Sequence, residues 1–364
     1  MTLLDRQPPG SGTSFGNACT FATYAVEPVA TPGIWRQAPG MLLRRDSPLA
    51  IRPGYLPRIA PWLWRFLQSS SEPRVKAISH DLHSLLKPCM GAWQALFDDA
   101  GANDLVRHDG SLYIFEAHER QSAIDMLAYH QGFEVPMRLV QGPELRAMEP
   151  ALNARAALAL ELPQVSRTLD PFALSQRLLR CFIERGGVFR RDELQGVERS
   201  AQDGERVLAR LGSGEQLPAE RLVLCSGAWS RRLAQSLGDE IPLDTERGYH
   251  VLFDQAGGLL SRPVCWGAGG FYLTPMAQGL RVAGTVEFGG LDAAPDPRRY
   301  HYLARAARRF LTLHHEPVSR WMGFRPSLPD SKPVLGQSRL LPQVHYNFGP
   351  VSYTHLTLPT KRIV

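Results

Sequence analysis

Long hydrophobic runs are absent from this sequence of 364 residues. No segment approaches the ~18 consecutive apolar residues that a transmembrane helix needs, and the N-terminus lacks the charged start and apolar core of a signal peptide. Cysteine is scarce as well: five are present, an odd count with no Cys-x-x-Cys spacing, which argues against a disulfide framework. We therefore expect a cytoplasmic protein with reduced thiols.

The sequence also has no block of like charge. Its net charge of +6 is spread along the chain, and the densest arginine cluster, within residues 298–309, has helical spacing with apolar neighbours. A solvated helix face explains such a cluster better than a nucleic-acid-binding stripe, so no nucleic-acid partner is expected. With 44% hydrophobic and 21% charged residues, the composition is that of a globular protein, and the length predicts two domains.

One arginine lies in an apolar, proline-stiffened stretch, Trp-Met-Gly-Phe-Arg-Pro-Ser-Leu-Pro-Asp at residues 321–330. A guanidinium presents a planar fork of donors that matches a carboxylate, and the aromatic residues and prolines around Arg325 would keep competing water away. The segment therefore indicates an anion-binding arginine. The alternative is an ordinary arginine on a turn beside a core tryptophan.

A family resemblance begins at the same place. Gly-Phe-Arg-Pro (323–326) followed by Pro-Asp-Ser-Lys-Pro-Val-Leu-Gly (329–336) resembles the C-terminal signature of the D-amino-acid oxidase and dehydrogenase superfamily, closest to the small-subunit type of D-amino-acid dehydrogenase. Members of this superfamily are flavoenzymes that oxidise amines. The resemblance implies an FAD cofactor, a small amino-acid substrate, and a role for Arg325 in gripping the substrate carboxylate.

Residues 241–287 carry the most specific part of the resemblance. They read as mainly β, and their strands resemble the antiparallel substrate sheet of amine dehydrogenases. The match places Tyr272 where oxidases of the superfamily help to hold the substrate carboxylate, and it places Tyr249 and His250 near the pocket. The alternative for all three residues is packing within the sheet.

The N-terminus begins with a short apolar strand, residues 2–5, that ends in an acid. In a dinucleotide-binding unit such an acid follows the glycine-rich phosphate turn by ~20 residues, which for Asp5 would place the turn before residue 1. Together with residues 12–18, the strand resembles the family's second strand and its flavin-contacting Ser-x-x-Asn-Ala segment. We therefore expect this chain to lack the first strand, the Gly-x-Gly-x-x-Gly turn and the first helix; alternatively, Asp5 simply ends a surface strand.

A second nucleotide-contacting motif is indicated at residues 221–230, where an apolar strand meets a turn of small residues. Such a turn lets backbone approach a cofactor closely, although any α/β fold can form one. The usual Ala-Gly or Thr-Gly of the family is here Ser-Gly. The resemblance as a whole implies cofactor-binding roles for Asp5, Arg6, Ser14, Asn17, Ala18, Val197, Ser226, Gly227, Trp229 and Gly349.

Helical spacing dominates residues 73–100, where apolar positions recur at three and four and Pro88 predicts a kink. His80 and His83 lie one turn apart there, but no third ligand joins them, so no metal site is expected. The preceding residues 61–67 are rich in tryptophan. They favour packing against the next helix, with a dip into a membrane surface as the alternative.

A β-hairpin is predicted around Asp109-Gly110, because this dipeptide separates two apolar runs. A helix should follow at residues 119–130, and another should begin at Asp170-Pro171. A further helix is expected over residues 297–314. These elements predict that the chain leaves a nucleotide domain for a substrate domain and later returns.

The fold class implied is α/β, with a Rossmann-like FAD-binding domain and an inserted substrate domain built on a mixed, largely antiparallel sheet. The FAD-binding domain is expected at residues 1–70, 161–238 and 323–350, and the substrate domain at 71–160 and 239–322. The last strand, 344–349, should continue into a glycine- and histidine-containing turn. Residues 351–364 instead resemble a translated sequencing-library adaptor; a natural polar tail is the alternative.

The resemblance implies oxidative deamination of amino acids, D-amino acids first among them, to 2-oxo acids and ammonia by hydride transfer from the α-carbon to flavin N5. Arg325 and Tyr272 would position the substrate, and no side chain need act as a base. Alternatives are glycine- or sarcosine-oxidase-like oxidation of another small amine, a nicotinamide-dependent dehydrogenase, or an inactive or merely basic binding protein. The electron acceptor, quinone or oxygen, is left open, as is peripheral contact with the cytoplasmic membrane face.

Overall fold

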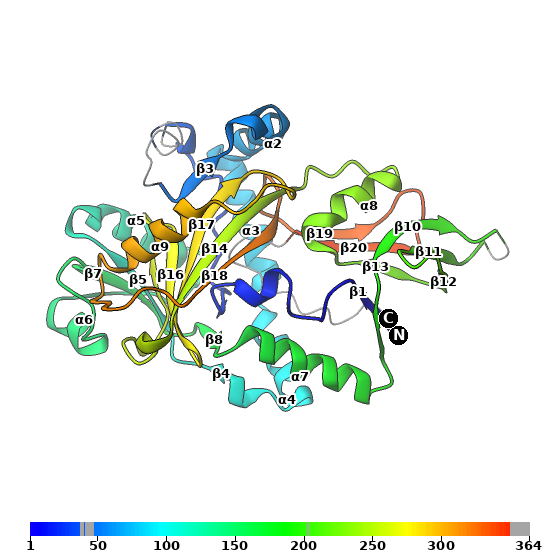
Figure 1. Ribbon diagram of the computed structural model, residues 1–364. Coiled ribbons are helices and arrows are strands. Elements are labelled where there is room, and N and C mark those ends of the chain that lie inside the picture. Colours follow the sequence, from blue (N-terminus) through cyan, green and yellow to red (C-terminus); the bar gives the residue numbers. More distant parts are fainter. Residues whose placement is uncertain (37–39, 41–46, 202–203, 350–364) are drawn as a thin grey trace.

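A nine-stranded mixed sheet is the largest sheet of the computed structural model, which describes residues 1–36, 40, 47–201 and 204–349 (Figure 1). Its spatial order is β18 (Ser319–Ser327), β14 (Asp244–Phe253), β17 (Gly279–Phe288), β16 (Phe271–Met276), β15 (Val264–Trp266), β5 (Ser111–Phe115), β7 (Leu158–Leu162) and β6 (Arg138–Gln141), with β3 (Leu49–Ile51) paired to β17. Two pairings are parallel, β15 with β5 and β17 with β3, and the others are antiparallel. The predicted mixed, largely antiparallel sheet is confirmed.

The sheet is covered on both faces, which is why its central strands are buried along almost their whole length. Helix α9 (Pro297–Ala307) packs on one face over Val251, Phe253 and Val282. Asp296 caps this helix by accepting a hydrogen bond from the Arg298 amide at 2.9 Å. The opposite face meets η1 (Thr13–Gly16) and the segment after it.

Four small sheets complete the chain, two of them built around parallel pairs. β1 (Thr2–Asp5) pairs parallel to β9 (Val188–Arg191), and β13 (Leu222–Leu224) pairs parallel to β20 (Val344–Phe348). The remaining small-sheet strands are β19 (Val334–Gln337), paired with β20, the meander β10 (Leu194–Arg199), β11 (Val207–Leu211) and β12 (Gln216–Ala219), and the group β2 (Thr20–Phe21), β8 (Ser166–Thr168) and β4 (Val106–Arg107). Most of them lie together at the right of Figure 1, beside the large sheet.

The helices follow the predicted spacing, with two differences in extent. They are α2 (Leu56–Ser69), α3 (Glu72–Leu86), α4 (Cys89–Ala100), α5 (Arg120–Gln131), α6 (Gly142–Met148), α7 (Pro171–Glu184), α8 (Ser230–Ser236) and α9. The kink expected at Pro88 is a complete break between α3 and α4, because proline offers no amide donor to continue the helix. The helix expected over 297–314 ends at Ala307. Within the described residues, no helix has both the length and the apolar character needed to cross a membrane.

The predicted hairpin at Asp109-Gly110 is wrong. Its two strands join different sheets: β4 pairs with β8, whereas β5 pairs with β7 and β15. Gly110 has a positive φ of 75° and donates its amide to the carbonyl of Val165, and the Asp109 carboxylate receives the Arg167 guanidinium at 2.9 Å. The dipeptide therefore connects β4 of a small sheet to β5 of the large sheet. The predicted adaptor-like tail, 351–364, lies outside the described residues.

Candidate active site

The guanidinium of Arg325 lies across the neighbouring strand β14. Arg325 stands in β18 next to the 244–253 strand, and its side chain passes directly over Gly248: a Cβ on that glycine would be 2.5 Å from Cζ and Nη2. The Arg325 Nη1 donates a 3.0 Å hydrogen bond to the carbonyl of Thr285. A glycine inside a strand commonly marks such a close approach. Gly248 thus provides the space in which the guanidinium is held.

Thr285 occupies a bulge in β17. Its φ is +61°, a left-handed conformation that β-branched residues rarely adopt, and the β14–β17 register shifts by one residue there. The Thr285 amide donates to Gly270 at 2.9 Å, and from Val286 onward the strand pairs with β3. Thr285 therefore lies where the pairing of β17 changes from β16, a pairing that ends at Gly284, to β3, a pairing that begins at Val286. Its carbonyl is thereby aimed at Arg325, and strain of this kind is concentrated at functional sites.

A buried carboxylate accompanies the arginine. Glu246 is the direct cross-strand partner of Arg325, and it accepts a 2.6 Å hydrogen bond from Ser327 Oγ. Burial raises the pKa of Glu246, while the Ser327 hydroxyl and the Arg325 charge act in the opposite direction. The site thus combines a half-exposed cation with a carboxyl group held in a low-dielectric setting.

Tyr272 and His250 lie on the same sheet face, in one row across the strands. The row runs Tyr272, Ala283, His250 and Trp321, each residue opposite the next. The His250 ring stacks on Trp321 with centroids 5.2 Å apart, and its Nδ1 lies 3.2 Å from the Gly16 carbonyl. Burial, aided by the Arg281 charge, lowers the pKa of His250 to about 3, so the ring is neutral at physiological pH. His250 holds η1 against the sheet.

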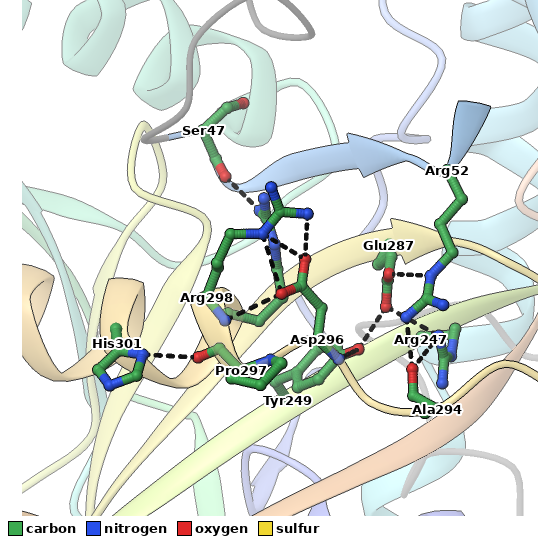
Figure 2. A network of polar contacts seen from close by, with 11 residues as sticks. Ser47, Arg52, Arg247, Tyr249, Glu287, Ala294, Asp296, Pro297, Arg298 and His301 are labelled. Atoms are coloured by element: carbon green, nitrogen blue, oxygen red, sulfur yellow. Dashed lines mark hydrogen bonds and ion pairs between the residues drawn. The ribbon is translucent and has the colours of Figure 1, made fainter.

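Tyr249 lies on the opposite face, away from Arg325 and Tyr272. Adjacent strand residues point to opposite faces, so Tyr249 and His250 cannot line one pocket. Figure 2 shows the Tyr249 hydroxyl directed at Glu287, the carboxylate that also receives Arg247 Nη1 at 3.1 Å and Arg52 Nε at 2.6 Å. The same hydroxyl accepts the Asp296 amide at 3.1 Å. We therefore leave Tyr249 out of the proposed site.

The segment expected to contact the flavin, residues 14–18, is tied to this face by its backbone. Arg281 donates to the carbonyls of Phe15 and Asn17 at 2.9 and 3.1 Å, and Thr274 Oγ1 donates to that of Ala18 at 2.9 Å. Ser14 lies in η1, half-buried. Among the described residues, the buried Nδ2 of Asn17 has no hydrogen-bond partner. An orphaned donor of this kind is expected where a ligand supplies the acceptor.

The remaining predicted residues form two groups. Arg6, directly after Asp5 at the end of β1, places its Cζ 3.9 Å from the centroid of Trp229, which itself packs edge-on against Phe324 at 5.5 Å. Ser226 and Gly227 form the turn before Trp229; Gly227 has φ +55°, and no atom would contact a Cβ there within 4 Å. Val197 and Gly349 lie apart from this group, Val197 in the core of the small sheets and Gly349 against Leu328.

Comparison with known proteins decides the family. Residues 1–357 match the family model described as FAD dependent oxidoreductase (DAO). The chain belongs to this family. A D-amino-acid oxidase of Bradyrhizobium diazoefficiens is 32% identical over 359 residues, 96% of this chain and 84% of that protein. A D-amino acid dehydrogenase of the same organism is 29% identical over 361 residues, again 96% and 84%.

Solved structures agree on the fold of this FAD-dependent oxidoreductase. Glycine oxidase from Geobacillus kaustophilus superposes with a TM-score of 0.71 over 98% of this chain and 84% of that one, at 18% sequence identity. Iminodiacetate oxidase from a Chelativorans species gives 0.70 over 98% and 85%, also at 18%. At these identities the comparison establishes the architecture.

The residues present fit FAD, the cofactor of the family. The unpartnered Asn17 amide offers a donor for an acceptor-rich ring edge, and the open, left-handed Gly227 turn leaves room for a nucleotide to approach backbone. Trp229, which follows this turn, contacts Arg6 on one side and Phe324, the neighbour of Arg325, on the other.

Sequence analysis missed the residues that hold Arg325 in place. Gly248 stands directly before Tyr249 in the stretch predicted to be β, and a glycine in the middle of a β pattern is the signal that could have identified it. Thr285 itself predicts ordinary extended strand, but Gly284, directly before it, is a glycine inside a β pattern and could have indicated the bulge.

Proposed function

We propose that this FAD-dependent oxidoreductase deaminates amino acids oxidatively, with D-amino acids as its main substrates. The observation that carries the proposal is the Arg325 guanidinium, held over Gly248 by the Thr285 carbonyl and sharing its sheet face with Tyr272. An amino acid differs from other amines by its α-carboxylate, and a fixed arginine fork is the group that recognises this anion. The relatives named D-amino-acid oxidase and D-amino acid dehydrogenase support the same substrate class.

In this proposal the chain's own residues bind and orient. Arg325 neutralises the carboxylate, Tyr272 donates to it, and His250, neutral and stacked on Trp321, keeps the flavin-contacting segment in place. Bound FAD supplies the acceptor for the hydride that leaves the α-carbon. Loss of the amine proton then gives an imino acid, which water converts to a 2-oxo acid and ammonia. Orientation accounts for the chain's contribution, and no side chain is assigned as base.

A substrate panel tests the proposal. The protein, supplied with FAD, is assayed against D- and L-amino acids, glycine, sarcosine and amines without a carboxylate, with a dye acceptor and with oxygen. We expect D-amino acids with side chains to be turned over fastest, with formation of the 2-oxo acid and ammonia. Preference for glycine or sarcosine would favour the small-amine alternative. Turnover of carboxylate-free amines as fast as that of amino acids would contradict the proposal that Arg325 binds the substrate carboxylate.

We also propose that α2 rests on an anionic bilayer. Trp64 is 64% exposed and Leu56 49% exposed on this helix, and Arg58 and Arg65 are exposed beside them. Tryptophan with arginine on one helix surface suits the lipid interface. The protein should sediment with vesicles containing phosphatidylserine, and Trp64→Ala with Arg65→Glu should abolish this while leaving dye-linked turnover intact. Failure of the unmodified protein to sediment would exclude the membrane contact.

A further inference from the structure

A pocket opens between α2 and α8, apart from the candidate active site. Its volume is about 200 Å³, and it is lined by both helices and by the connection from α8 to β14. Sites for drug-sized ligands typically enclose ~300 to 1,000 Å³, so this pocket suits a small chemical group better than a nucleotide. Arg325 is not among its lining residues.

Three arginines line this pocket, two from α2 and one from α8. Arg58 and Arg65 are seven positions apart, which is about two helical turns, so they lie on one face of α2. Arg231 comes from the first turn of α8, much later in the chain. The fold therefore brings together guanidinium groups from two distant segments.

The positive charge of the pocket is only partly balanced. Within the described part of the chain, neither Arg58 nor Arg65 forms an ion pair. The Arg231 side chain is 47% exposed, and its Nη1 lies 3.9 Å from an oxygen of Asp244. Asp244 and Glu240 also line the pocket, so one positive charge is in excess when all five groups are ionised.

The Asp244 carboxylate is already engaged inside the fold. The Tyr55 hydroxyl lies 2.9 and 3.1 Å from its two oxygens, and the Thr245 amide donates to one of them at 2.7 Å. Burial raises the pKa of Tyr55, and the charges of Arg231 and Arg58 both act to lower it. The two helices thus direct positive charge at one point, and of the lining acids only Glu240 is left to balance the arginines of α2.

The arrangement of the guanidiniums indicates the chemistry of a ligand. One guanidinium is enough to bind both oxygens of a carboxylate. Arginines that approach from two helices suit an anion with more acceptor oxygens around one centre, as in a phosphate group. Gln235, one turn after Arg231 on α8, adds neutral amide donors, and Trp62 provides an apolar wall.

We propose that the pocket between α2 and α8 is a phosphate-binding site formed by Arg58, Arg65 and Arg231. The phosphate group belongs either to a free phosphate or to a phospholipid, and the inference does not depend on the proposed function. A bound phosphate links α2, which packs on Phe288 of the large sheet, to α8, which packs in the core of the small sheets. Binding should therefore stabilise the fold.

Phosphate titration of the protein supplied with FAD tests the site. The melting temperature is followed against inorganic phosphate at constant ionic strength, which is set with potassium chloride because salt screens such contacts. Phosphate also stabilises proteins in general, since it is excluded from their surface, but that effect does not saturate. We expect an additional, saturable rise in melting temperature, from which a dissociation constant follows.

Variants assign the binding to the pocket. Arg58→Gln, Arg65→Gln and Arg231→Gln should each weaken phosphate binding at least about fivefold, the effect of losing one charged contact at a partly exposed site. Arg232→Gln is the matched control, because Arg232 is the exposed neighbour of Arg231 on α8 and does not line the pocket. Arg325→Leu should also leave phosphate binding unchanged, which separates this site from the candidate active site.

A vesicle measurement identifies the source of the phosphate group. If the source is a lipid, the protein sediments with phosphatidylcholine vesicles that contain phosphatidic acid, and Arg231→Gln weakens this while Arg232→Gln does not. If the source is free phosphate, saturable stabilisation is seen without such sedimentation. The proposal fails if neither inorganic phosphate nor these vesicles bind. It also fails if the three pocket variants bind normally, or if Arg232→Gln weakens binding equally, since the attraction would then be that of a positive surface in general.

Discussion

Gly248 and Arg325 lie on adjacent strands, and the guanidinium of Arg325 fills the space that any side chain at position 248 would need. The clash would fall on the far end of a flexible side chain, with Cζ and Nη2 both 2.5 Å from the added Cβ. The arginine can move aside at small energetic cost. The backbone of β14 need not move, so the position of the guanidinium can be tested separately from the stability of the fold.

Gly248→Ala should therefore impair function without unfolding the protein. We expect kcat/KM for amino acids to fall about ten- to hundredfold, because a misplaced positioning group of this kind costs up to about a hundredfold. The melting temperature and the FAD content should stay close to those of the unmodified enzyme. Gly336→Ala is the control, since no atom lies within 4 Å of a Cβ there. A large loss of stability with Gly248→Ala would contradict the expectation.

Arg325→Leu should remove the carboxylate's partner outright. Truncating one member of a buried charge pair costs about 2 to 5 kcal/mol, which corresponds to a loss in kcat/KM of roughly thirty- to several-thousandfold. Arg325→Lys keeps the charge without the fork and should recover part of the activity. Steady-state kinetics on amino acids and on carboxylate-free amines provide the check. Equal losses on both, or loss of FAD instead, would make Arg325 a structural residue.

His250 should make the fold sensitive to acid. Burial lowers its pKa from 6.5 to about 3. Above pH 6.5 the ring is therefore neutral in both the folded and the unfolded chain, and its full contribution to folding stability is present. Below pH 6.5 the His250 ring becomes protonated in the unfolded chain but stays neutral in the folded chain. Stability is then lost, by up to about 1.4 kcal/mol per pH unit, as pH falls toward 3.

Urea denaturation of the unmodified protein and of His250→Asn, between about pH 7.5 and pH 5, measures this loss. Asparagine retains a donor for the Gly16 carbonyl but does not titrate. The difference in free energy of unfolding between the two proteins should shrink as pH falls. A difference that stays constant across this range would contradict the expectation, because it would mean that unfolding does not change the protonation of His250.

Glu287→Gln should destabilise the fold strongly. Arg247 is fully buried, Glu287 is 1% exposed, and the carboxylate also receives Arg52 and the Tyr249 hydroxyl (Figure 2). Removing one partner of a buried ion pair costs about 3 to 5 kcal/mol, because the other charge stays buried. The control is Glu316→Gln, whose partner Arg308 is 2.7 Å away but whose own side chain is 79% exposed; it should cost less than about 1 kcal/mol. Similar free energies of unfolding for the two variants would refute the expectation.

Local patterns predicted much of the fold because they depend on short stretches of chain. The helix after Asp170 begins where the aspartate and proline indicated, with the carboxylate accepting the amides of Phe172 and Ala173. The sequence pattern also predicted correctly that residues 241–287 are mainly β. Strand pairing could not be predicted in this way. β5 pairs in parallel with β15, which is far from it in sequence, and no local signal opposes a hairpin at Asp109-Gly110.

The site shows the same division. The resemblance assigned Arg325 and Tyr272 to one substrate site, and the structure places both on one face of the large sheet. Strand alternation alone could have separated Tyr249 from His250. The left-handed conformation of Thr285 could not be predicted, because threonine disfavours a φ of +61° and the residue lies where the pairing of β17 changes from β16 to β3. Nor could the convergence of Tyr24 with Tyr113, which depends on segments far apart in sequence. The roles assigned to the individual residues stay predictions until the variants are measured.

β18 lies at the edge of the large sheet and is its last strand in the chain. On the ribosome, β5, β6 and β7 can pair while most of the later strands are still being translated, but Arg325 can take its place across Gly248 only when synthesis has passed Ser327. A polypeptide released just before β18 would contain every other strand of the sheet but would lack Arg325. If Arg325 binds the substrate carboxylate as proposed, such a product would be inert toward amino acids, and their turnover would report that synthesis has passed β18.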